Sequence, residues 1–157
     1  MIQANQPLPE GQLQERKNGE MNAYNTLEFF SDKKVVLFAV PGAFTPTCSE
    51  AHLPGYVVNF DEFKAKGVDA VICLAVNDAF VMEAWGNAQN AENIMMLADG
   101  DGSFTKTLGL EMDTAGFGGL RSQRYAMIVD DGVVTSLFVE KPKEFEASKA
   151  ETVLAAL

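Results

Sequence analysis

The chain has 157 residues, of which 47% are hydrophobic and 22% charged, proportions typical of a globular domain and not of a disordered or fibrous protein. Its 12 basic and 22 acidic residues give a net charge of -10, which excludes the basic surface that a nucleic-acid-binding protein needs. Two cysteines are too few for a disulfide framework, and the N-terminal residues lack signal-peptide character, so we expect a reduced, cytoplasmic protein. No apolar run approaches the roughly 20 residues that cross a bilayer, so we expect no membrane partner.

The first half of the chain predicts a strand with a tight turn, a buried strand and a long helix. Residues 11–16 predict a strand that enters a tight Asn-Gly turn, because this dipeptide favours positive φ. Residues 35–40 form a continuous apolar run rich in β-branched side chains, which indicates a strand buried on both faces. Helical spacing then runs from about residue 46 to residue 66, with a kink expected at Pro54.

The second half alternates short strands and helices. Strands are predicted over residues 68–76, 94–98, 124–129 and 133–139, and helices over residues 79–89, 103–108 and 148–157. This order predicts an α/β fold with a central mixed sheet flanked by helices, in a single domain over residues 1–157. Ligands in such folds bind beyond the carboxyl ends of the parallel strands, so residues 41–48 and the helix-capping pair Asn77-Asp78 should line one edge.

Three patterns resemble known ligand sites but lack the residues that such sites need. A calcium-like loop begins at Asp99, but Phe104 stands in place of its glycine and Leu110 in place of its glutamate. The glycine-rich residues 116–119 are followed by Arg121 where a dinucleotide loop needs its third glycine. One histidine and two distant cysteines do not form a zinc pattern.

Cys48 falls in the first turn of the helix predicted after residues 35–40. Backbone N–H groups and the positive end of the helix dipole stabilise a thiolate at such a position. Thr45 offers a hydroxyl to an incoming oxygen three residues earlier, and Pro41, with its rigid ring and no N–H, could shield the thiol from water. A lone cysteine is as commonly a small buried hydrophobic residue, so placement alone leaves a reactive and an inert Cys48 both open.

Two of the three arginines, Arg121 and Arg124, lie close together in this acidic chain. Alternation along the predicted strand places Arg124 on the same face as Ala126 and Ile128, and Arg121 on the opposite face. Arg124 could supply charge and a forked hydrogen-bond donor to a thiolate or an oxyanion, although a structural ion pair is the more common use of an arginine.

Two further residues have competing interpretations. His52 follows Cys48 by four residues on the same helical face and could contact a thiolate. It has no obvious orienting partner, which favours a structural role over that of a catalytic base. Cys73 lies in the middle of an apolar strand, which favours a buried core residue.

The spacing Pro-x-x-x-Thr-x-x-Cys, formed by Pro41, Thr45 and Cys48, resembles the active-site motif of the peroxiredoxins. The longer string Pro-Gly-Ala-Phe-Thr-Pro-Thr-Cys-Ser-x-x-His-Leu-Pro-Gly-Tyr, from residue 41 to residue 56, is similar to the peroxiredoxin-5-like branch, which includes plant type II enzymes. Residues 76–82 and 121–127 extend the resemblance.

The resemblance implies a thioredoxin-like fold and thiol-dependent reduction of hydrogen peroxide and alkyl hydroperoxides, with no metal or organic cofactor. By position, Cys48 corresponds to the peroxidatic thiolate, and Thr45 to the residue that holds the peroxide oxygens. Arg124 corresponds to the residue that activates thiolate and peroxide, and Pro41 to the one that shields the pocket. Relatives also suggest a homodimer.

The sequence leaves the recycling of the oxidised cysteine open. Cys73 lies 25 residues after Cys48, as does the second cysteine of plant type II enzymes, which makes it a possible resolving cysteine. Its place three residues before the expected strand end puts it about 10 Å below the sheet edge, beyond the roughly 7 Å between Cα atoms that a disulfide allows. We therefore expect an external reductant, either glutathione with glutaredoxin or thioredoxin.

Two other classes of function also use an oxidisable cysteine. A thiol–disulfide oxidoreductase would carry a Cys-x-x-Cys motif, which this chain lacks. A non-enzymatic peroxide sensor or redox-regulated holdase would use the same Cys48. Saturable, reductant-dependent peroxide consumption distinguishes an enzyme from such a sensor.

Overall fold

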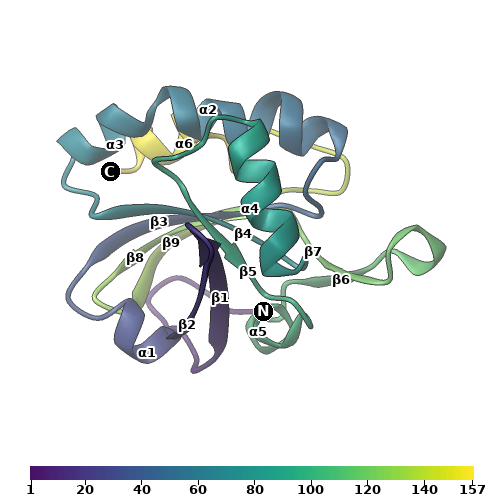
Figure 1. Cartoon of the computed structure of the whole chain (residues 1–157). Helices are drawn as coiled ribbons and strands as arrows, with labels where there is room; N and C mark the ends of the chain where they lie inside the picture. Colours follow the sequence, from purple (N-terminus) through teal and green to yellow (C-terminus); the bar gives the residue numbers. More distant parts are fainter.

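The computed structural model describes all residues, 1–157, and its centre is a seven-stranded mixed β-sheet (Figure 1). The strands are β1 (Gln12–Lys17), β2 (Glu20–Asn25), β3 (Lys34–Ala39), β4 (Ala70–Ala75), β5 (Met95–Ala98), β6 (Glu111–Asp113), β7 (Leu120–Ser122), β8 (Tyr125–Asp130) and β9 (Val133–Val139). The order in the sheet is β2-β1-β5-β4-β3-β8-β9, and β6 and β7 form a separate two-stranded ribbon.

Helices cover both faces of this sheet. They are α1 (Thr26–Phe29), the π-helical turn η1 (Cys48–His52), α2 (Leu53–Val58), α3 (Phe60–Ala65), α4 (Ala79–Ala88), α5 (Ser103–Leu108), the short 3-10 turn η2 (Ala115–Phe117) and α6 (Ala150–Ala155). Helices α2, α3, α4 and α6 lie over one face, whereas α1 and α5 lie by the other (Figure 1). No helix has the length and apolar character needed to cross a membrane.

The predicted alternation along β8 is confirmed by the two hydrophobic cores. Ala126 and Ile128 belong to the core beneath α2, α3, α4 and α6, which also contains Cys48. Tyr125 and Met127 belong to the core on the opposite face. Arg124, the residue before β8, therefore has its side chain on the same face of the sheet as Cys48.

The expected meeting of two loops at the carboxyl edge of the sheet is also confirmed. Strands β3 and β4 are parallel neighbours, so both end at this edge. The Asn77 side chain accepts a hydrogen bond from the N–H of Ala43 (3.0 Å), which ties the two loops together. Asp78 caps α4 by accepting from the N–H of Val81 (2.9 Å), as its position before the helix predicts.

The last helix differs from the prediction. It begins at Ala150 rather than at Ser148, and the preceding residue, Lys149, has extended backbone angles. The N–H of Ser148 donates to the carboxylate of Glu140 instead of entering a helix (2.7 Å). Because the Glu140 carboxylate takes this backbone donor, the helix begins further along the chain.

Candidate active site

Cys48 lies in the first turn of the helical region that follows β3 and begins at Pro46. Just before it, Phe44 turns the chain with a left-handed backbone (φ 65°), a conformation that a bulky side chain rarely adopts. The N–H of Leu53 reaches back five residues to the Cys48 carbonyl and closes a π-helical turn. This turn directly precedes Pro54, which has no N–H to donate, so the kink expected at the proline takes the form of a wider turn before it.

Arg124 brings its guanidinium to the sulfur of Cys48. Nη2 of Arg124 lies 3.2 Å from Sγ of Cys48, across 76 residues of sequence. The Cys48 side chain is fully buried, and a thiolate there is stabilised by a cation that also donates a hydrogen bond. The fold thus brings together two residues that were singled out separately from the sequence.

Arg121 does not share this site, but the reason differs from the prediction. It lies in β7, which belongs to the separate ribbon, so alternation along β8 does not govern its direction. Its Nη1 donates to the carbonyl of Val76 (2.7 Å) and its Nε to the carbonyl of Gly118 (3.1 Å). Arg121 therefore fastens the ribbon to the end of β4.

His52 contacts the arginine and makes no hydrogen bond to the thiol. Its Nδ1 lies 2.9 Å from Nη1 of Arg124, and its Nε2 lies 3.1 Å from the carbonyl of Ser148. An arginine can only donate, so Nδ1 must accept, and the ring proton resides on Nε2. Burial and the positive charge of Arg124 lower the pKa of His52 to about 3, which keeps the ring neutral.

Aromatic rings support His52 from three sides. Phe38 on β3 stacks on Tyr56 with ring centroids 3.9 Å apart, and the His52 ring lies 5.0 Å from that of Phe38. Phe145 contacts His52 edge-on at 5.0 Å. The Tyr56 hydroxyl donates to the same Ser148 carbonyl that accepts from His52 (2.7 Å).

A cavity of about 430 Å³ lies against Arg124. Pro41, Thr47 and Arg124 line one part of it, and residues 140–145 line another. Neither Cys48 nor Thr45 is among the lining residues, but the Cys48 sulfur contacts Arg124, which does line the cavity. Thr45, one helical turn before Cys48, donates its hydroxyl to the carbonyl of Gly42 (2.7 Å), so its oxygen lone pairs remain free to accept.

Known proteins share this arrangement and its sequence. The chain matches the Redoxin family over residues 3–154. Reduced Prx3 of Vibrio vulnificus, solved in complex with hydrogen peroxide, is 68% identical with a TM-score of 0.98, covering 99% of each chain. The chain belongs to the peroxiredoxins.

Relatives from photosynthetic organisms agree with this assignment. A peroxiredoxin of Synechocystis is 49% identical over 84% of this chain and 74% of its own length. Peroxiredoxin-2D of Arabidopsis thaliana is 46% identical over 90% of this chain and 88% of its own. The expected thioredoxin-like fold and peroxiredoxin family are thus confirmed, and the protein is a thiol-dependent peroxidase.

The second cysteine of this peroxiredoxin, Cys73, is a free thiol in the sheet. It lies in β4 beside Phe38 of β3 and Met96 of β5, and it is fully buried. Burial raises the pKa of the Cys73 thiol well above its ordinary value, and the proximity of Cys48 raises it further. Cys73 and Cys48 share one hydrophobic core, but no bond joins them.

Sequence reasoning missed several residues of the site. Ser148 and Phe145 reach His52 only through contacts between distant segments, so no local pattern marks them. Tyr56 lies four residues after His52, and its hydroxyl meets the same Ser148 carbonyl. Trp85 of α4 donates its Nε1–H to the hydroxyl of Ser49 (3.0 Å), which directly follows Cys48. A signal for Trp85 was available, because it is the only tryptophan of the chain and lies on a helix predicted to begin at the same sheet edge.

Proposed function

We propose that the Cys48 thiolate attacks the terminal oxygen of hydrogen peroxide or an alkyl hydroperoxide. A sulfur–oxygen bond forms as the oxygen–oxygen bond breaks, so sulfur is oxidised by two electrons to a sulfenic acid. The leaving oxygen takes up a proton and departs as water or as an alcohol. The single observation that carries this proposal is the 3.2 Å contact between Nη2 of Arg124 and Sγ of Cys48.

In this mechanism the residues around the thiol have distinct roles. Arg124 donates a hydrogen bond to the sulfur and stabilises charge that develops on the leaving oxygen. Thr45 accepts a hydrogen bond from the peroxide through a free lone pair, which aligns the two oxygens for attack. Pro41 forms part of the cavity wall and restricts the access of water.

We infer that an external thiol reduces the sulfenic acid. The complete burial of Cys73 within β4 supports this route, because an internal disulfide would require part of the sheet to open. Glutathione with glutaredoxin is the reductant we favour, with thioredoxin as the second candidate. We also propose the cytoplasm as the compartment, because it keeps thiols reduced and both cysteines of this chain are free thiols.

The experiment that tests this function is peroxide turnover with each donor in turn. Hydrogen peroxide consumption is followed with glutathione alone, with glutathione and glutaredoxin, and with thioredoxin and its reductase. We expect saturable turnover with at least one of these donors. A single stoichiometric oxidation with every donor would instead favour the sensor interpretation.

We also propose that the protein forms a homodimer. The supporting observation is that two large aromatic side chains near the active-site edge are exposed: Phe44, in the loop after β3, is 56% exposed, and Phe80, in the first turn of α4, is 60% exposed. Large exposed aromatic side chains favour burial in an interface. Sedimentation equilibrium of wild-type protein and of a Phe44→Ser, Phe80→Ser variant tests this: we expect a dimer for the first and a monomer for the second.

A further inference from the structure

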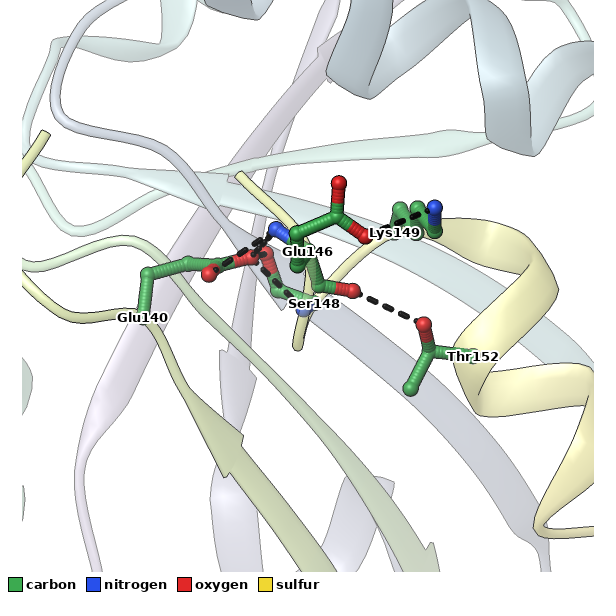
Figure 2. A network of polar contacts seen from close by, with 5 residues as sticks. All are labelled: Glu140, Glu146, Ser148, Lys149 and Thr152. Carbon is green, nitrogen blue, oxygen red and sulfur yellow. Dashed lines mark hydrogen bonds and ion pairs between the residues drawn. The ribbon is translucent and has the colours of Figure 1, made fainter. Parts of the chain in front are cut away.

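Glu140 holds the segment that runs from β9 to α6. Its carboxylate accepts from the N–H of Glu146 (2.9 and 3.0 Å to its two oxygens) and from both the N–H and the hydroxyl of Ser148 (2.7 Å each) (Figure 2). We call residues 141–149 the strap. The Glu140 side chain is buried, and a carboxylate in such a place needs these donors to offset its loss of hydration.

The strap touches the catalytic arginine through two routes. The carbonyl of Ser148, itself fully buried, accepts from His52, and His52 in turn accepts from Arg124. Phe145 packs against the His52 ring and also lies beneath the guanidinium of Arg124, whose Cζ is 5.9 Å from the ring centroid.

Glu140 is also joined directly to the backbone of Arg124. Its N–H donates to the Arg124 carbonyl (3.0 Å), which continues the pairing of β8 with β9 beyond the strand ends. Glu140 therefore fixes Arg124 at two places: at the backbone, and through Ser148 and His52 at the guanidinium.

We propose that Glu140 is a positioning residue for peroxide reduction, because its hold on the strap sets the Ser148 carbonyl that orients His52 and, through it, Arg124 against the Cys48 sulfur. This inference rests on the proposed role of Arg124. A guanidinium that must contact both a thiolate and a peroxide loses much of its effect if it shifts by about 1 Å. Glu140 itself touches neither the sulfur nor the substrate.

The test compares Glu140→Gln with the matched variant Glu146→Gln. Glutamine keeps the size of residue 140 but presents one acceptor oxygen in place of two and adds a donor beside the strap's N–H groups. The side chain of Glu146 is 77% exposed and pairs only with Lys149 (2.9 Å), so its neutral variant should match wild type (Figure 2).

Two readouts separate positioning from simple anchoring. Stopped-flow oxidation by hydrogen peroxide gives the rate of sulfenate formation. In a Cys73→Ala background, where Cys48 is the only thiol, the pH profile of iodoacetamide alkylation reports the thiolate fraction of Cys48. For Glu140→Gln we expect a rate about tenfold lower or more, and an alkylation profile moved to higher pH. A lower thermal midpoint with both readouts at wild-type values would overturn the proposal.

A double-mutant cycle with His52→Phe tests the route. If Glu140 acts through His52, Glu140→Gln should cost little further rate in the His52→Phe background. Losses that multiply in the double variant would overturn the proposal. Should Glu140→Gln fail to fold, Ser148→Ala removes one donor to Glu140 but keeps the carbonyl, and a smaller loss in the same two readouts is expected.

A parallel measurement on Arg124→Leu distinguishes failure of the role proposed for Glu140 from failure of the role proposed for Arg124. A large loss in Arg124→Leu with none in Glu140→Gln overturns only the positioning role of Glu140. An unchanged rate in Arg124→Leu overturns the proposed role of Arg124, and the role of Glu140 with it.

Discussion

Nη1 of Arg124 donates to Nδ1 of His52 at 2.9 Å, and this contact determines the protonation of the ring. The remaining proton lies on Nε2, which donates to the Ser148 carbonyl. A protonated ring would place two positive groups in contact and leave no acceptor for the arginine. His52 is thus a neutral hydrogen-bond acceptor that orients Arg124, and its tautomer leaves it no lone pair with which to act as a general base toward Cys48.

The first prediction concerns the titration of His52, the only histidine of the chain. Burial and the charge of Arg124 lower its pKa to about 3. Its Hε1 resonance in a proton NMR spectrum should therefore stay constant between about pH 5 and pH 8, where an ordinary histidine titrates. A midpoint near the ordinary value of about 6.5 would contradict the assigned hydrogen bonds.

The same shift predicts a dependence of stability on pH. The pKa of His52 is about 3 in the folded state and ordinary in the unfolded state, so between these values the unfolded chain binds more protons. The free energy of unfolding should therefore fall as pH decreases from about 6.5. Urea unfolding of His52→Phe should show a shallower dependence on pH than wild type. Identical slopes would mean that His52 does not contribute.

Arg124→Leu should slow sulfenate formation by about 10²–10³-fold, the usual cost of removing a donor that stabilises developing negative charge. The matched control is Arg121→Leu, because Arg121 donates only to the carbonyls of Val76 and Gly118. That control should oxidise at nearly the wild-type rate. Equal rate losses in both variants, measured by stopped flow, would show that net charge near the cleft matters rather than contact with the sulfur.

Local sequence patterns were sufficient to predict the residues of the site that lie on regular elements. Alternation along β8 predicted the core face of Ala126 and Ile128, and with it the side from which Arg124 approaches Cys48. The helix cap at Asp78 was predictable because aspartate commonly precedes a helix. The meeting of two loops at one sheet edge was predictable because parallel neighbouring strands end at the same edge.

The residues around His52 could not be predicted in this way. The ring is oriented by Ser148, which is 96 residues away in the sequence and lies in a segment without regular structure. The π-helical turn also changes the spacing, because hydrogen bonds that span five residues replace the four-residue periodicity on which the expected contact between His52 and Cys48 depended. The predicted reason for the direction of Arg121 was also wrong, because the chain passes from one sheet to the other between residues 122 and 125, and alternation along β8 does not extend to Arg121.

Replacement of the second cysteine should affect stability more than catalysis. Cys73 is fully buried in β4, so Cys73→Ala leaves a small cavity and should lower the free energy of unfolding by about 1 kcal/mol. Turnover with glutathione and glutaredoxin should remain close to wild type. After one equivalent of peroxide without added thiol, mass spectrometry of wild-type protein should find oxidation on Cys48. A rapid, stoichiometric disulfide between Cys48 and Cys73 would show instead that Cys73 resolves the sulfenic acid.

Oxidation of the site should be visible in tryptophan fluorescence. The only tryptophan, Trp85, donates to the hydroxyl of Ser49, which adjoins Cys48. Addition of an oxygen to the buried sulfur should disturb this turn and change the emission at the rate of sulfenate formation. In Cys48→Ser the emission should not respond to peroxide, and a response in that variant would place the oxidised residue elsewhere.

The most direct test of the central claim is the initial rate of hydrogen peroxide consumption by Cys48→Ser, measured with the donor that supports wild-type turnover. A serine hydroxyl stays protonated at neutral pH and offers no comparable nucleophile beside Arg124. We predict a rate equal to that of the donor system without the protein, for a variant whose thermal midpoint shows that it is folded. Peroxidase turnover that survives in Cys48→Ser would contradict the account.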